Sequence, residues 1–266
     1  MPRPIRIVLV GLCYVAFGGF GAILAAFVLP LALLGVREPA ARIAAAQALL
    51  HRWSRRYFRF MHALGIVRPT YPPCPELLAD GGGVVVVANH PSLLDVVFIM
   101  AALPRITYVA KQAWMGAPII GRMLRACGHI AAPVGKDPAD GAIALERMIA
   151  ALVDNRALLV FPEGTRSPRL GMHEFRRGAF EAAARAGVPI LPCAIRVDPP
   201  MLRKHQPWYD VAERPIDFAM QVLPTIEPSE LGDGSRVMAK RVHDAIAAAV
   251  GVLPERPEPA TAASPP

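Results

Sequence analysis

The sequence predicts an α/β fold, a largely parallel sheet flanked by helices, preceded by an N-terminal membrane helix and an amphipathic helix. From Gly83 onward, short apolar runs alternate with helical stretches, as in parallel sheets whose strands are joined by helices. Before that point, residues 7–36 contain no charged side chain. The chain has 266 residues, of which 54% are hydrophobic, so it can bury the core of one such domain.

Residues 1–37 are expected to anchor the chain in a membrane. As a helix, the apolar run would be about 45 Å long, whereas the hydrocarbon core of a bilayer is about 30 Å thick. Tilt, a kink at Pro30, or a hairpin that enters and leaves on one face would each accommodate the excess. A cleaved signal peptide is the alternative, but its apolar region normally spans only about 7–15 residues.

Residues 38–70 are expected to form a basic amphipathic helix at the membrane surface. Apolar residues recur at helical spacing up to Leu64, and arginines project from another side, which suits an anionic lipid surface. The alternative is an ordinary helix packed on the domain with solvated arginines. Basic residues crowd after the apolar run, which predicts the cytoplasmic face of the inner membrane. The apolar positions are Ile43, Ala46, Leu50, Trp53, Tyr57, Phe60, Met61 and Leu64, and the arginines are Arg52, Arg55, Arg56 and Arg59.

The catalytic domain is expected to cover residues 71–253, followed by a disordered tail at 254–266. The valine run at 84–87 is predicted to be a buried strand. Further strands are predicted at 106–110, 130–134, 157–161, 188–197 and 216–222. Helices are predicted at 92–102, 115–125, 138–155 and 175–186, and from Ser235 onward.

The charge and the cysteines of the chain bear on its binding partners and on the compartment in which it works. The formal net charge of +8 suits anionic lipid and nucleic acid equally well, so charge alone does not choose a partner. The chain has 4 cysteines, which are widely scattered. Without a CxxC pair or regular spacing, they are expected to be reduced thiols of a cytosolic domain.

The first candidate site is the segment from Asn89 to Asp95, where the valine-rich strand ends and a helix begins. Active sites of open α/β sheets gather at this edge. His90 is expected ahead of the first helical turn, with Asp95 inside it. Folded back, Asp95 would accept the proton on one imidazole nitrogen and leave the other basic. The alternative is local structure alone, because Ser92-x-x-Asp95 is a capping box and Asn89 with Pro91 suits a turn.

The second candidate site is the segment 161–167, Phe-Pro-Glu-Gly-Thr-Arg-Ser, which also follows an apolar strand. A strand-end loop with Gly164, two hydroxyl groups and Arg166 offers backbone amides and a guanidinium to a phosphate. Arg169, Arg176 and Arg177 add positive charge nearby in the sequence. The alternative is a simple turn with solvated arginines.

Together, in this order, the two segments resemble the motifs of the lysophospholipid acyltransferase family. Its best-known members are the 1-acylglycerol-3-phosphate acyltransferases. His90-x4-Asp95 is similar to the family's His-x4-Asp motif, and residues 163–166 are similar to its Glu-Gly-Thr-Arg motif. Val188-Pro189-Ile190-Leu191-Pro192 is similar to the block on the following strand. The resemblance covers about residues 80–200 and implies a fold like that of glycerol-3-phosphate acyltransferase.

The resemblance also implies a mechanism without a covalent enzyme intermediate. His90 would deprotonate the acceptor hydroxyl as it attacks an acyl thioester, and Asp95 would support the imidazole. The donor would be acyl-CoA or acyl carrier protein, without a cofactor. The acceptor would be 1-acylglycerol-3-phosphate, or alternatively another hydroxylated lipid or lyso-aminolipid. The residues expected to bind substrate are Asn89, Ser92, Lys111, Glu163, Gly164, Thr165, Arg166 and Arg177.

The sequence departs from the family at another motif, which lies between these two segments and ends in arginine. Here the segment from Gly128 to Lys136 contains no arginine, and Lys136 is expected to substitute, although lysine lacks the bidentate fork. Membrane lipids are expected partners, and neither nucleic acid nor metal is. The rival hypothesis is a non-catalytic membrane-binding protein. The other histidines, which lack partners at metal-ligand spacing, are expected to be structural or at the surface: His51, His62, His129, His173, His205 and His243.

Overall fold

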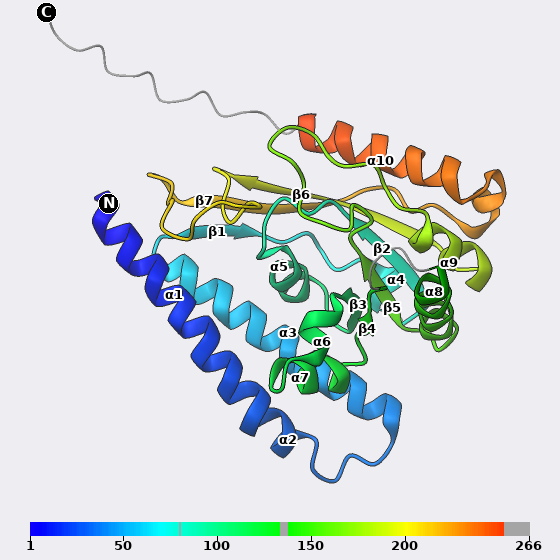
Figure 1. The fold of residues 1–266 in the computed structure, drawn as a ribbon, viewed down its shortest axis with the longest axis horizontal. Coiled ribbons are helices and arrows are strands. Elements are labelled where there is room, and N and C mark those ends of the chain that lie inside the picture. The colour runs from blue at the N-terminus through cyan, green and yellow to red at the C-terminus, as the bar shows by residue number, and fades with distance from the viewer. Residues whose placement is uncertain (80, 134–137, 253–266) are drawn as a thin grey trace, which may run out of the picture.

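The strands form one mostly parallel sheet in the computed structural model, which describes residues 1–79, 81–133 and 138–252 (Figure 1). Within these residues, the order is β1-β7-β6-β2-β5-β3-β4. Only β7 runs antiparallel to a neighbour, β6, in this part of the chain. The predicted α/β fold is therefore confirmed. The strands are β1 (Val67–Thr70), β2 (Val84–Ala88), β3 (Ile106–Ala110), β4 (Ile130–Ala131), β5 (Ala157–Val160), β6 (Ile190–Asp198) and β7 (Ile216–Val222).

Helices cover both faces of the sheet, and β2 shows why its sequence is apolar throughout. Val84 and Val86 belong to one core, with residues of α3 (Pro39–Ala63) and α5 (Asp95–Ala102). Val85 and Val87 belong to a second core, with α8 (Pro138–Val153), α9 (Gly178–Ala186) and α10 (Ser235–Val252). A strand buried on both faces needs an unbroken hydrophobic run instead of an alternating one. In Figure 1, α8, α9 and α10 lie apart from α3.

The apolar N-terminal segment is one long helix with an internal irregularity. It comprises α1 (Arg3–Ile23), a π-helical turn η1 (Leu24–Val28) and α2 (Leu29–Ala32). Pro30 has no N–H to donate to a carbonyl of the preceding turn, which accounts for an irregularity ahead of it. Among the described residues, this is the one helix long and apolar enough to cross a membrane. Only 22% of its most apolar window is buried within the protein.

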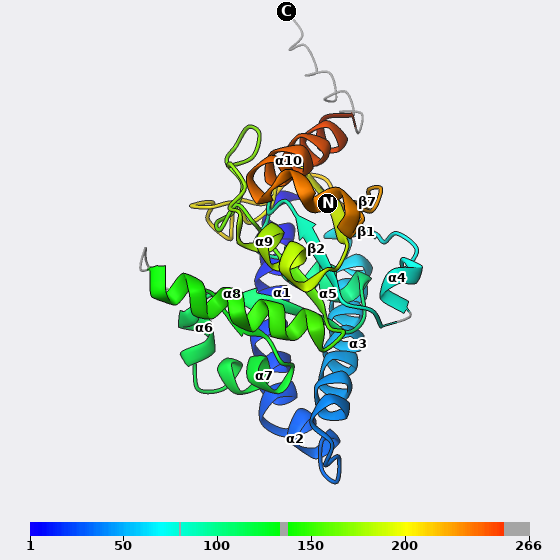
Figure 2. The ribbon, with the colours of Figure 1, turned by 90° about the vertical axis from the view of Figure 1, so that its right-hand side faces the viewer.

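Helix α3 packs its apolar face on the domain. Phe58 and Met61 are fully buried, and the Phe58 ring contacts Phe98 and Phe218 at centroid distances of 5.3 and 5.5 Å. On its outer side α3 lies beside α1, where Phe17 meets Tyr57 at 5.2 Å (Figures 1 and 2). This packing matches the alternative of a helix packed on the domain. Its arginines are exposed, so their contact with lipid headgroups stays a prediction.

Several predicted boundaries were wrong for local reasons. The helix predicted at 115–125 is divided into α6 (Gln112–Gly116) and α7 (Ile120–Ala126), because proline at 118 interrupts the helical hydrogen bonds. Helix α5 begins at Asp95 and not at Ser92, since a turn precedes it. Helix α9 begins at Gly178, later than predicted, and β6 begins at Ile190. The helix predicted at 38–70 ends at Ala63, and the last part of that segment forms β1. The sequence did not indicate α4 (Glu76–Ala79) or the 3-10 turn η2 (Pro228–Asp233).

Candidate active site

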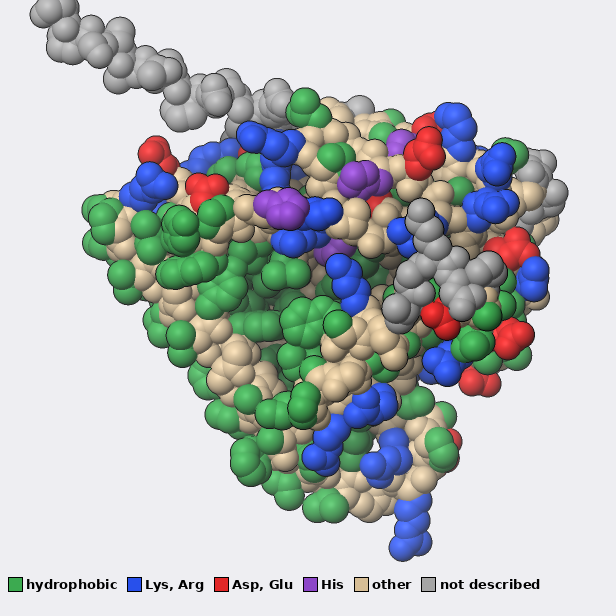
Figure 3. Space-filling view, viewed as in Figure 1, with side chains coloured by type: hydrophobic (Ala, Val, Ile, Leu, Met, Phe, Trp, Pro, Cys, Tyr) green, Lys and Arg blue, Asp and Glu red, His purple; other side chains and the backbone are tan. Residues whose placement is uncertain are grey.

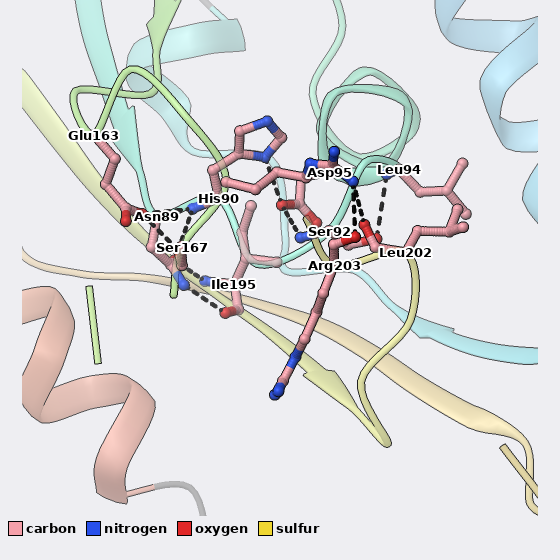
Figure 4. A network of polar contacts seen from close by, with 11 residues as sticks. Asn89, His90, Ser92, Leu94, Asp95, Glu163, Ser167, Ile195, Leu202 and Arg203 are labelled. Carbon is pink, nitrogen blue, oxygen red and sulfur yellow. Dashed lines mark hydrogen bonds and ion pairs between the residues drawn. The ribbon is translucent and has the colours of Figure 1, made fainter. Parts of the chain in front are cut away.

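His90 and Asp95 meet at the end of β2. The distance from His90 Nδ1 to Asp95 Oδ2 is 2.8 Å (Figure 4). Because an ionised carboxylate only accepts hydrogen bonds, Nδ1 carries the proton and Nε2 keeps its lone pair. The His90 side chain is 16% exposed and that of Asp95 is fully buried. The pair therefore has an imidazole that reaches the surface and a carboxylate that does not.

The carboxylate of Asp95 also accepts a backbone hydrogen bond from the turn that precedes α5. Its Oδ2 accepts the Ser92 N–H at 2.7 Å, so one oxygen both caps the turn and supports the imidazole. Oδ1 has no hydrogen-bond partner among the described residues. Burial raises the pKa of Asp95 to about 6, against the opposing effect of hydrogen bonds from His90 and Ser92. The carboxyl group is consequently ionised at neutral pH in a poorly solvated position.

The ring of Phe161 fixes the plane of the imidazole. The two rings stack with centroids 4.3 Å apart and an interplanar angle of 24°. Phe161 directly follows β5, the neighbour of β2 in the sheet. The sequence placed Phe161 in the second motif but did not indicate this contact, because nothing in a single sequence shows which strand ends are adjacent.

Glu163 lies inside the loop that it belongs to. Its side chain is only 4% exposed, and both carboxylate oxygens have partners. Oε1 accepts the backbone N–H of His90 at 3.0 Å and the hydroxyl of Ser167 at 2.6 Å. Oε2 accepts the backbone N–H of His173 at 2.9 Å. Glu163 therefore holds the two motif loops together, a different position from the predicted contact with substrate.

The buried side chains of Asn89 and Ser92 form hydrogen bonds with the backbone around the first motif. Asn89 is 2% exposed, and its amide pairs with the backbone of Ile195 in β6, accepting its N–H at 2.7 Å and donating to its carbonyl at 2.9 Å. Ser92 is fully buried, and its hydroxyl accepts the Leu94 N–H at 3.3 Å. The structure thus places both side chains beneath the site, whereas the sequence led us to expect substrate contacts.

Arg166 is tied to the connection between β6 and β7. Its Nη1 donates to the carbonyl of Leu202 at 2.8 Å and to that of Arg203 at 3.0 Å. The carbonyl of Leu202 also accepts the N–H of Leu93 at 3.2 Å, so this connection contacts both motifs. Leu202 and Arg203, at the start of this connection, therefore belong to the surroundings of the site.

The other predicted substrate-binding residues are more accessible. Lys111 is exposed directly after β3, at the start of α6, and Arg177 is exposed at the start of α9. Gly164 has a left-handed φ of +68°, and a Cβ there would lie 2.7 Å from the guanidinium carbon of Arg176. Thr165 is partly exposed beside it. Lys136 lies outside the described residues.

Three of the other histidines have partners outside the His90–Asp95 pair. His129 contacts Tyr108 at a ring-centroid distance of 3.9 Å, and burial lowers its pKa to about 3. His51 and His62 contact backbone carbonyl groups through Nδ1 at 2.7 and 3.0 Å. In the described ranges, no group of three or more His, Cys, Asp and Glu residues is arranged to hold a metal ion.

Comparison with known proteins finds relatives that are named as acyltransferases. The chloroplastic 1-acyl-sn-glycerol-3-phosphate acyltransferase BAT2 of Brassica napus is 27% identical over 155 residues, covering 55% of this chain and 44% of that protein. The human 1-acyl-sn-glycerol-3-phosphate acyltransferase alpha is 32% identical over 166 residues, covering 60% and 56% respectively. The chain therefore spans about half the length of these relatives.

The crystal structure of the 1-acyl-sn-glycerophosphate acyltransferase PlsC from Thermotoga maritima has the same fold. It matches with a TM-score of 0.77 at 20% identity, covering 97% of this chain and 100% of that one. Residues 74–196, which include both motifs, match the family described as Acyltransferase. This segment of the chain, which carries both motifs, is therefore similar to the acyltransferase family.

Proposed function

We propose that the chain is an O-acyltransferase that moves a fatty acyl group from acyl-CoA or acyl carrier protein to the hydroxyl of 1-acylglycerol-3-phosphate. The observation that carries this proposal is the His90–Asp95 pair, held at 2.8 Å beside the loop that contains Arg166. The names of the relatives support the choice of acceptor.

In the proposed reaction, Nε2 of His90 takes the proton of the acceptor hydroxyl while its oxygen attacks the thioester carbonyl. A carbon–oxygen bond forms and the carbon–sulfur bond breaks. The departing thiolate then receives the proton from His90. Asp95 stabilises the imidazolium that exists between these two transfers. His90 and Asp95 are thus assigned to proton transfer, without a covalent intermediate on the enzyme.

We assign the acceptor phosphate to the cationic rim of the site. Arg166 and Thr165 supply a guanidinium and a hydroxyl next to the backbone amides around Gly164, and Lys111 and Arg177 are exposed at the starts of α6 and α9. Lys136, which the resemblance to the family brought forward, is proposed to assist. The apolar α1 would bind the membrane, with the catalytic domain on the cytoplasmic face of the inner membrane.

The test uses the full chain in phospholipid vesicles, supplied with several lyso-acceptors and with either acyl-CoA or acyl carrier protein. Thiol release and mass spectrometry of the lipids would measure the reaction and identify the product. We expect the diacyl product of 1-acylglycerol-3-phosphate, and a loss of about 10²–10⁴ in rate for His90→Ala. His243→Ala in α10 serves as the matched control. Equal thiol release by wild type and His90→Ala would favour a non-catalytic membrane-binding protein instead.

A further inference from the structure

The connection from Met201 to Asp210 joins the N-terminal helix to both catalytic motifs. At its start, Met201 and Leu202 are buried. Leu202 has a φ of 53°, an unfavourable conformation for a residue with a Cβ, which the surroundings must maintain. In this conformation its carbonyl accepts hydrogen bonds from Leu93 and Arg166. The start of the connection therefore fixes the guanidinium that we assign to the acceptor phosphate.

The end of the same connection packs on α1. Trp208 meets Tyr14 of α1 edge to face, with ring centroids 6.0 Å apart. A Cβ at Gly11 would lie 3.5 Å from the Trp208 ring, so the small glycine allows the indole to approach the helix closely. The buried Arg6 donates to the carbonyl of Arg214 at 2.9 Å, which holds α1 to the residues just before β7.

The outer surface of this contact is apolar and aromatic. Trp208 and Tyr209 are 47% and 55% exposed. The neighbouring part of α1 exposes Val8, Leu12 and Val15. Figure 3 shows hydrophobic side chains gathered along α1 and over the surface beside it. Tryptophan and tyrosine favour the boundary between the hydrocarbon core and the headgroups of a bilayer, because their rings are apolar and carry one polar group.

We propose that the Met201–Asp210 connection is a clasp through which a lipid bilayer, contacted by α1 and Trp208, positions Arg166. Because Trp208 belongs both to the lipid-facing surface and to the connection, lipid that favours its packing on α1 also favours the fixed position of Leu202. Such an effect requires lipid contacts that differ between the docked and undocked connection, and an indole at the junction provides them. The inference rests on the proposed function, since it assigns the acceptor phosphate to Arg166.

The hydrogen bonds of Arg166 suit a positioning role of this kind. Both carbonyl groups accept hydrogen bonds from Nη1, and among the described residues neither Nε nor Nη2 of Arg166 has a hydrogen-bond partner. A guanidinium held on one side by two carbonyls presents its remaining N–H groups in a fixed direction, as bidentate binding of phosphate requires. Trp208 and Leu202 are accordingly positioning residues, whereas Arg166 is the group that touches the acceptor.

The kinetic test compares Trp208→Ala with Trp53→Ala in vesicles that contain 1-acylglycerol-3-phosphate. Trp53 of α3 also contacts α1, through Phe20 at 5.8 Å, but is not part of the connection. We expect Trp208→Ala to raise the KM for the acceptor about tenfold with a smaller change in kcat and in the KM for the donor. Trp208→Phe should restore the acceptor KM, whereas Trp53→Ala should leave it near the wild-type value. Equal effects of the two alanine variants, or an unchanged KM in Trp208→Ala, would overturn the proposal.

A second measurement tests the lipid contact without activity. In the double variant Trp53→Phe and Trp114→Phe, the only tryptophan is Trp208, because the chain has 3. Its fluorescence should shift to shorter wavelength on binding vesicles and be quenched by brominated lipid, and absence of quenching would refute the clasp. Failure of the proposed function is distinguishable, since it appears as inactivity of the wild type toward every lyso-acceptor.

Discussion

The carboxylate of Glu163 accepts a hydrogen bond from the backbone N–H of His90, although 73 residues separate the two in the sequence. The same loops are joined a second time, because the Ser167 N–H donates to the His90 carbonyl at 2.8 Å. The position of the proposed general base is thus determined by the second motif as well as by its own. The two carboxylate oxygens of Glu163 accept hydrogen bonds from three donors. The amide of a glutamine has only one oxygen and an NH2 group, so it cannot accept all three.

Glu163→Gln should therefore lower kcat and stability without weakening acceptor binding. One of its two terminal atoms becomes an NH2 group that faces an N–H or O–H donor, which leaves buried groups unpaired at a cost of about 1–3 kcal/mol. Denaturant unfolding and steady-state kinetics would measure both effects. Glu174→Gln, at an exposed neighbouring position, is the control. A raised acceptor KM with an unchanged kcat would instead make Glu163 a direct ligand of the headgroup.

Asp95→Asn should be more stable than the wild type at pH 7 and less active. The pKa of Asp95 is raised from the ordinary value of 3.8 to about 6 in the folded protein, mainly by burial. Above pH 6 the buried carboxylate is charged, which costs on the order of 2 kcal/mol relative to a neutral side chain. Activity should fall about a hundredfold or more, because an amide cannot stabilise an imidazolium by charge.

The pH dependence of this difference provides the check. Between pH 3.8 and about 6 the folded wild type binds more protons than the unfolded chain, so its stability falls as the pH rises through this window. The amide that replaces the carboxyl group in Asp95→Asn does not titrate, and the stability advantage of the variant should accordingly grow from pH 4 to pH 7 and then level off. An advantage that shrinks over this range, measured by urea unfolding, would contradict the raised pKa.

The His90–Asp95 contact was predictable because it depends on local geometry. A histidine just before a helix and an aspartate in its first turn lie within reach of each other whatever the rest of the fold does. The valine run likewise indicated a strand covered on both faces. Strand β7 alternates buried and partly exposed residues, but this pattern does not reveal that it pairs antiparallel with β6.

The hydrogen bonds that hold the site residues in place were not predictable, because they join segments that are distant in the sequence. Asn89 and Ile195 are 106 residues apart, and a single sequence does not show that their strands are neighbours. The resemblance to the family led us to expect Asn89, Ser92 and Glu163 to touch substrate. Only the folded chain shows that their polar atoms are already paired with other residues.

Asn89→Asp should destabilise the fold more than an ordinary surface substitution. The Asn89 amide both donates to and accepts from the backbone of Ile195, so it completes the hydrogen bonding between β2 and β6 beyond the end of β2. A carboxylate cannot donate, and its charge would be buried against the Ile195 carbonyl, a loss of about 2–4 kcal/mol. Thermal unfolding would measure it, with Asn155→Asp as a control at a helix end. Wild-type stability at neutral pH would show that the amide is not required.

Phe58→Ala should weaken the packing of α3 on α5 and on the sheet. The Phe58 ring is fully buried and contacts Phe98 of α5 and Phe218 of β7, so truncation leaves a cavity that two separate elements cannot fill together. We expect a loss of about 3–5 kcal/mol in the free energy of unfolding. Leu170→Ala, at a side chain that is 91% exposed, should leave stability nearly unchanged. Because α1 packs on α3, Phe58→Ala should also increase proteolysis between α1 and α3, and protection equal to wild type would show that α3 is held mainly by its other contacts.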